Sequence, residues 1–137
     1  MRRDRCHGFR YSRAVVGFGG TPSLWWMRFL KKGFYHCVVA LGSGRQWLLI
    51  DPLLHYTDAI MIDDGDAECF LRKQGYRTLR VRITEPRRRF RLRPYTCVET
   101  AKRFLGLEAP HVWTPYQLFR FLIKNRKIIL DNDPKVC

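Results

Sequence analysis

Apolar and polar residues alternate along several short segments, and this period of two is typical of half-buried strands. In residues 76–83, Leu79 and Val81 alternate with Arg80 and Arg82. Six segments are predicted as strands on this pattern and on their β-branched and aromatic content: residues 14–18, 34–41, 46–51, 59–62, 76–83 and 89–93. Residues 127–130 are expected to add an edge strand.

Four other segments carry helix start and stop signals. Thr21-Pro22 is expected to open a helix that runs to about residue 32, because threonine caps helices and proline suits their first position. Residues 66–74 and the segments that begin after Thr96 and Thr114 are predicted as the other helices. The pattern therefore predicts an α+β fold, a small and mainly antiparallel sheet with helices packed on it.

The composition agrees with one globular domain. The chain has 137 residues, of which 46% are hydrophobic and 14% aromatic, so it can bury a core without disulfides. No repeat or linker interrupts it. We expect residues 14–130 to form the domain, with a basic arm at 1–13 and a tail at 131–137.

Charge and cysteine spacing exclude several classes of protein. The 26 Lys and Arg against 12 Asp and Glu give a net charge of +14, which favours polyanionic or acidic partners. No CxxC pair or zinc-ligand spacing occurs among the five cysteines, so we expect no disulfide framework, metal or cofactor. No segment is apolar for long enough to be a signal peptide or to span a bilayer, which favours a soluble cytoplasmic protein.

One cysteine lies where a nucleophile is favoured. Thr96 and Glu99 have capping-box spacing, which makes Cys97 the first residue of a short helix that Gly106 ends. Unpaired N–H groups and the helix dipole favour a thiolate at this position. The alternative is a buried helical cysteine without chemistry.

A thiolate nucleophile also needs a base and a group that orients the base. If the hairpin of 34–41 and 46–51 turns at Ser43-Gly44, His36 lies directly opposite Asp51 and shares its face of the sheet. Asp51 would then orient His36, whose other nitrogen would face Cys97. His55 is the alternative orienting residue.

Three further residues are expected to lie outside this triad. Cys37 points to the other side of the strand and fills the core, His7 lies in the arm, and His111 packs in a loop.

These residues resemble the circularly permuted branch of the NlpC-like, papain-like thiol hydrolases. That branch includes lecithin-retinol-acyltransferase-like, YaeF/YiiX-like and small phage-encoded proteins. The resemblance covers roughly residues 14 to 123 and rests on a Gly-Thr-Pro-led helix, an aromatic-x-His strand and Tyr95-Thr96-Cys97-Val98 before a helix. It departs from the family at Cys37, where a small or apolar residue is common, and at Asp51, where His, Glu or Gln is frequent.

The resemblance implies that Cys97 is the nucleophile, His36 the base and Asp51 the third polar residue. The chemistry would be attack on an amide, ester or thioester carbonyl of a peptide, lipid or protein-conjugate substrate, through an acyl-enzyme. The backbone N–H of Cys97 is a natural oxyanion donor. Tyr95 is a candidate for lining the site.

A non-catalytic basic binding module is the rival hypothesis. If residues 76–83 and 89–93 pair, their arginines share one face that suits nucleic acid or an acidic protein. These are Arg80, Arg82, Arg89, Arg91 and Arg93. A solvated, solubilising face would have the same pattern.

Overall fold

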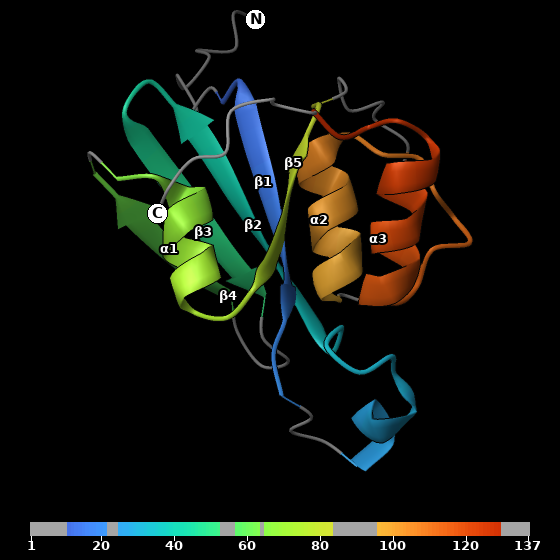
Figure 1. Ribbon diagram of the computed structural model, residues 1–137. Coiled ribbons are helices and arrows are strands. Elements are labelled where there is room, and N and C mark those ends of the chain that lie inside the picture. The colour runs from blue at the N-terminus through green and yellow to red at the C-terminus, as the bar shows by residue number, and fades with distance from the viewer. Residues whose placement is uncertain (1–10, 22–24, 53–56, 64, 84–95, 130–137) are drawn as a thin grey trace, which may run out of the picture.

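A computed structural model describes residues 11–21, 25–52, 57–63, 65–83 and 96–129. Five strands form one antiparallel sheet in the order β4-β3-β2-β1-β5 (Figure 1). Their bounds are β1 Arg13–Gly19, β2 His36–Ser43, β3 Gln46–Pro52, β4 Thr57–Ile62 and β5 Arg77–Val81. The three α-helices are α1 Ala67–Lys73, α2 Cys97–Leu105 and α3 Pro115–Lys124. The predicted α+β class is confirmed.

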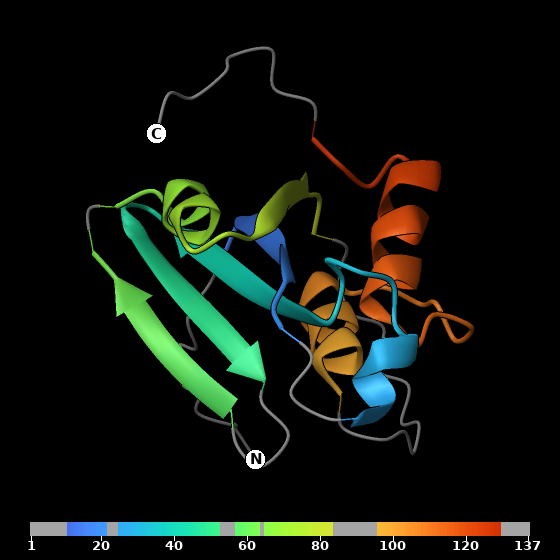
Figure 2. The same cartoon turned by 60° about the horizontal axis from the view of Figure 1, so that its bottom comes forward.

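The helices cover both faces of the sheet. Alternate residues of β1 and β2 fall into two separate hydrophobic clusters: Val15 and Val38 pack with α1, whereas Val16 and Val39 pack with α2 and α3. Because successive strand residues point to opposite faces, α1 lies on one face and the α2–α3 pair on the other. Figures 1 and 2 show α2 and α3 side by side, apart from α1.

The predicted caps form at both ends of α2 and at the start of α3. The Thr96 hydroxyl accepts from the Glu99 N–H at 3.1 Å, and Gly106 ends α2 in the left-handed conformation. At α3, Thr114 and Gln117 make the complete reciprocal capping box. Cys97 is therefore the first residue of α2, as the sequence predicts.

The hairpin register differs from the predicted one. Ser43 lies opposite Gln46 and Val39 opposite Ile50, so the turn is centred one residue later and the pairing is shifted by two residues. Asp51 therefore lies diagonally from His36 instead of directly across. A shift of two keeps every side chain on its face, so the prediction that the two residues share a face survives.

The predicted helix from Pro22 to about residue 32 is wrong. The structure has only a short 3-10 helix, η1 (Trp25–Phe29), and residues 22–24 are outside the described residues. An amphipathic helix is stable when its apolar face is packed. Here the Trp25 and Phe29 side chains are exposed, so this stabilisation is missing.

Smaller differences lie at the C-terminal side. Residues 127–129 do not form a full strand but meet β5 through an isolated bridge between Val81 and Ile128. Ile123 of α3 is exposed. The predicted strand 89–93 lies outside the described residues. Within the described part of the chain, each helix is too short or too polar to cross a bilayer.

A buried ion pair fixes α2 to the segment that follows it. Lys102 is only 4% exposed, and its Nζ lies 2.5 Å from Glu99 Oε1. The same ammonium donates to the carbonyls of Ala109 and Val112, each at 3.0 Å. Buried charges are tolerated when they are paired and hydrogen-bonded in this way.

We predict that Lys102→Ala strongly destabilises the protein. It leaves a buried carboxylate without its cation and two buried carbonyls without a donor, a loss of about 3–5 kcal/mol. Urea unfolding followed by circular dichroism measures the change. Arg103→Ala, at the exposed neighbour, is the control and should change stability by less than about 0.5 kcal/mol. Equal stability of the two variants would contradict the role of Lys102.

Candidate active site

The candidate site forms where the first residue of β2 meets the first residue of α2. His36 begins β2 and Cys97 begins α2, and these two elements pack against each other on the sheet. Asp51 comes from β3, the neighbouring strand. Strand pairing and helix packing thus bring together three side chains from distant parts of the chain.

Asp51 holds the imidazole. His36 Nε2 lies 2.5 Å from Asp51 Oδ1, across the diagonal of the β2–β3 pair. Diagonal neighbours in a sheet lie within reach of long side chains. Because Nε2 faces Asp51, Nδ1 is the ring nitrogen left for the hydrogen bond between His36 and Cys97.

The contact between Cys97 and His36 favours an ion pair. Burial lowers the pKa of His36, but hydrogen bonds to Asp51 and Cys97, and the charges of both, raise it to about 9. A hydrogen bond from Cys37 lowers the pKa of Cys97. The hydrogen bond and charge of His36 lower it further, and together they outweigh burial to give a pKa of about 5. Between these values the pair is thiolate and imidazolium, the form in which a cysteine is nucleophilic.

Cys37 is a residue of the site that the sequence analysis missed. It is fully buried, and its own pKa lies well above the usual range, first because of its hydrogen bond to Cys97 and then because of burial. Its thiol therefore stays protonated and donates to the Cys97 thiolate. The prediction that Cys37 fills the core is confirmed, but it does so against the Cys97 sulfur. Its place next to His36 was the available signal.

Tyr76 packs on β1 beside the site, and Gly20 lies against the backbone and Cβ of His36. Gly19 lies opposite His36, and a Cβ added there would be 3.1 Å from the Tyr76 ring. Burial, followed by the charges of Asp51 and Cys37, raises the pKa of Tyr76. Gly20 has a φ of +86°, and a Cβ there would be 3.0 Å from the His36 Cβ. Glycines at these positions leave room for the Tyr76 ring and for the His36 Cβ.

The other histidines do not join this cluster within the described residues. His111 is exposed in the loop between α2 and α3, with its ring centroid 6.2 Å from that of Phe121. The alternative orienting residue His55 lies outside the described residues, as do His7 and Tyr95. Asp51 is therefore the carboxylate that the described structure places on His36.

The predicted arginine face is only partly described. Arg80 lies 2.6 Å from the buried carboxylate of Glu68, so this arginine is engaged in packing α1 on the sheet. Arg82 is exposed. The remaining members of the face, Arg89, Arg91 and Arg93, lie outside the described residues, so that face stays a prediction.

Cys69 departs from the sequence expectation. It is disulfide-bonded, whereas Cys37 and Cys97 are free thiols. The sequence predicts no disulfide framework and a cytoplasmic protein, and a disulfide is unusual in the cytoplasm, which is reducing. Among the described cysteines, the two thiols of the site are the free ones.

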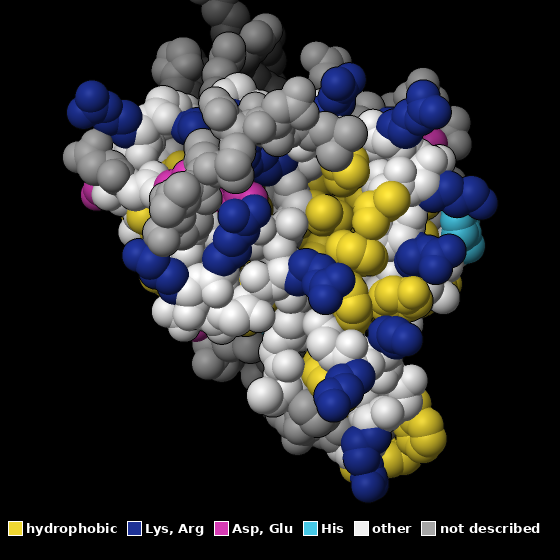
Figure 3. Space-filling model, viewed as in Figure 1, with side chains coloured by type: hydrophobic (Ala, Val, Ile, Leu, Met, Phe, Trp, Pro, Cys, Tyr) yellow, Lys and Arg dark blue, Asp and Glu magenta, His cyan; other side chains and the backbone are white. Residues whose placement is uncertain are grey.

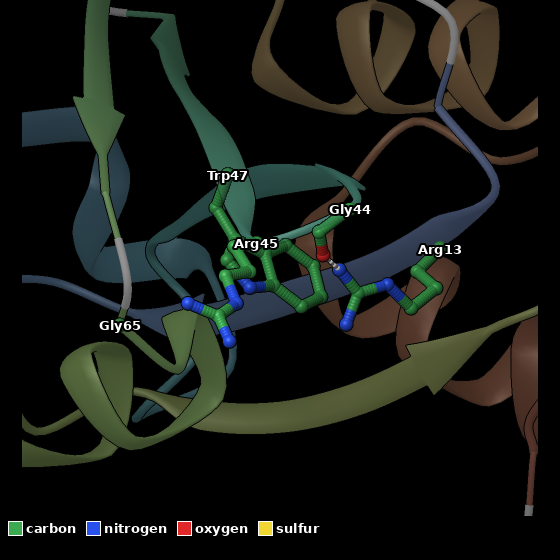
Figure 4. Close-up of a pocket in the computed structure, with 5 residues that line it drawn as sticks. All are labelled: Arg13, Gly44, Arg45, Trp47 and Gly65. Atoms are coloured by element: carbon green, nitrogen blue, oxygen red, sulfur yellow. Dashed lines mark hydrogen bonds between the residues drawn. The ribbon is translucent and has the colours of Figure 1, made fainter.

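A separate hollow lies at the opposite end of β1 (Figure 4). It has a volume of about 390 Å³, and its lining includes Trp47, with the Arg13 guanidinium 4.5 Å from a Trp47 ring centroid. Arg13 also donates to the Gly44 carbonyl. The described residues that line it, Arg13, Gly44, Arg45, Trp47 and Gly65, supply no nucleophile or general base. No cluster of three or more metal-binding side chains occurs in the described part of the chain.

Comparison with known proteins adds no relative. No protein-family model, curated protein or solved structure matches the chain. The arrangement of Cys97, His36 and Asp51 is therefore the evidence that bears on function.

We predict that iodoacetamide alkylates Cys97 with a half-maximal rate near pH 5, because its pKa is lowered to about 5. An unperturbed thiol would have its midpoint near pH 8.5, as roughly expected for free cysteine. In His36→Ala the midpoint should rise, because the imidazolium that stabilises the thiolate is gone. Peptide mass spectrometry across a pH series measures this. A midpoint that His36→Ala leaves unchanged would show that the two groups do not interact.

We predict that Gly20→Ala disturbs the imidazole, whereas Gly33→Ala does not. Both glycines have a left-handed φ, +86° and +84°, so both variants carry similar backbone strain. Only at Gly20 does the new Cβ meet His36; nothing lies within 4 Å at Gly33. Gly20→Ala should therefore raise the pH midpoint of Cys97 alkylation, whereas Gly33→Ala should not. The two variants should lose a similar amount of stability. The same midpoint in both variants would contradict this packing.

Proposed function

We propose that this protein is a cysteine hydrolase or acyltransferase of the permuted papain-like type. The observation that carries the proposal is the contact chain from Cys97 to His36 to Asp51, assembled from the starts of α2 and β2 and from β3. Nucleophile, base and orienting carboxylate are the three parts that cysteine-based acyl transfer requires.

The first half of the reaction would form a thioester. The Cys97 thiolate attacks the carbonyl carbon, and the negative charge moves to the carbonyl oxygen. The first-turn N–H groups of α2 have no partner inside the helix, so the Cys97 N–H is a suitable donor to that oxyanion. Collapse of the tetrahedral intermediate breaks the bond to the leaving amine or alcohol, which takes a proton from the His36 imidazolium.

The second half would release the acyl group. Neutral His36 accepts a proton from water, or from an acceptor alcohol or amine, as that nucleophile attacks the thioester carbonyl. The thiolate leaves, and the imidazolium beside it restores the resting ion pair. Asp51 holds the ring in one orientation through both halves and stabilises its positive charge.

Cys37 supports this proposal by its effect on the thiolate. Its hydrogen bond is the largest of the contributions that lower the pKa of Cys97. The thiolate would thus rest between a neutral donor and a cation. Substitution of Cys37 separates the two contributions.

We predict that wild-type protein treated with p-nitrophenyl acetate gains one acetyl group on Cys97 and releases nitrophenolate with a burst. Cys97→Ala should abolish the adduct. His36→Ala should slow its formation by about 10²–10⁴-fold, the usual range for a general base. Asp51→Asn should slow it less. Intact-mass and peptide mass spectrometry identify the site, and an adduct elsewhere with Cys97 unmodified would refute the proposed nucleophile.

We predict that Cys37→Ala raises the pKa of Cys97, whereas Cys37→Ser raises it less because serine keeps a donor. The measurement is the pH midpoint of acetylation or alkylation in each variant. Circular dichroism confirms that both variants fold. Equal midpoints in the wild type and the alanine variant would remove Cys37 from the site.

A further inference from the structure

The segment between β1 and β2 projects from the body of the protein and ends in the short helix η1 (Figures 1 and 2). Two large aromatic side chains on it face solvent: Trp25 is 71% exposed and Phe29 is 84% exposed. Their rings pack edge to face, with centroids 6.4 Å apart. Exposed aromatic residues gathered on one protruding element indicate an interaction surface.

The same element is strongly basic. Arg28, Lys31 and Lys32 are all exposed. The sequence contains no acidic residue between Asp4 and Asp51, so no carboxylate within this segment offsets the three cations. Figure 3 shows apolar side chains at the projecting end with Lys and Arg beside them.

The projecting element is anchored at its base. Tyr35 donates its N–H to the Gly19 carbonyl at 3.1 Å, which closes the neck of the segment. Phe34 is buried and packs against Phe18, with ring centroids 5.9 Å apart. Met27 is buried within η1 itself. The exposed rings are therefore presented on a held scaffold.

We propose that the η1 tip, defined as Trp25, Arg28, Phe29, Lys31 and Lys32, docks this protein on an anionic lipid bilayer. Tryptophan and phenylalanine insert at the bilayer interface, and lysine and arginine are attracted to anionic headgroups. The tip combines both features.

The shape of the tip favours a bilayer over a macromolecular partner. A stable protein interface buries more than about 1,000 Å² of matched surface, far more than two rings and three cations provide. Single-stranded nucleic acid is bound along a groove that tracks its backbone, and a convex projection offers none. A bilayer instead deforms around a small inserted tip.

This inference goes beyond the proposed function, because docking does not require Cys97 to be reactive. It also has a spatial consequence. The projecting segment leaves β1 at Gly20, which contacts His36, and returns directly into His36. A docked tip would hold the candidate site close to the membrane surface.

Vesicle co-sedimentation tests the proposal. The wild type should bind vesicles of equal parts phosphatidylcholine and phosphatidylglycerol more tightly than pure phosphatidylcholine vesicles. Trp25→Ser with Phe29→Ser should weaken binding to the anionic vesicles roughly tenfold or more. The matched control is Trp113→Ser with Ile129→Ser, which removes two exposed apolar side chains elsewhere, and it should stay within about twofold.

A second pair of variants separates the tip from the overall charge of the protein. Arg28→Gln with Lys31→Gln and Lys32→Gln should reduce binding more than Lys73→Gln with Arg103→Gln and Lys124→Gln, although each set removes three positive charges. Equal losses would show that only net charge acts and would overturn the proposal.

Two other outcomes would also overturn it. One is unchanged vesicle binding by the Trp25/Phe29 variant. The other is absence of vesicle binding together with binding to an oligonucleotide or a polyglutamate that requires the tip. Circular dichroism confirms folding of every variant. The Cys97→Ala protein should bind vesicles like the wild type, which keeps this result separate from the test of catalysis.

Discussion

The contact between the start of α2 and the start of β2 constrains the arrangement of the whole candidate site. The low pKa of Cys97 is not a property of that residue alone. It arises because packing holds the Cys97 sulfur against the neutral thiol of Cys37 and the cationic ring of His36. Further along the same helix, the buried Lys102 ties α2 to the carbonyls of Ala109 and Val112.

The sheet provides the second part of this arrangement. Asp51 reaches the His36 ring across a diagonal, and Gly20 lies against the His36 Cβ. Both neighbours thus restrict this side chain. In the proposed acyl transfer, such restriction would lower the cost of reorienting the ring when charge moves.

Local signals in the sequence were sufficient for much of this fold. Thr96, Thr114 and Gly106 act within one helical turn, so their patterns predicted both ends of α2 and the start of α3. The β2–β3 register was wrong by two residues, because the turn had been placed one residue early, yet the period of two preserved the meeting of His36 with Asp51.

The features that the sequence did not predict have a common cause, since each depends on packing between residues far apart in the chain. Trp25 and Phe29 are residues typical of a helix face that packs on a core. The local sequence does not show that both side chains are exposed in the folded protein. Alternation assigned Cys37 to the face opposite His36, but Cys97 lies at the strand end and contacts both. The Tyr76 ring over Gly19 joins β1 to a residue far along the chain, so no short pattern contains it.

The closed neck of the projecting segment affects how this protein can change. The Tyr35–Gly19 hydrogen bond and the buried Phe34 fix both ends of this segment. The pairing register of β1 with β2 therefore does not depend on the length of the segment between them. Lengthening a surface excursion costs little, since closure entropy grows only with the logarithm of loop length. Residues 21 to 33 are thus a place where insertions or exchanges can accumulate while the strands on either side stay aligned, so the proposed docking tip and the proposed catalytic site can evolve separately.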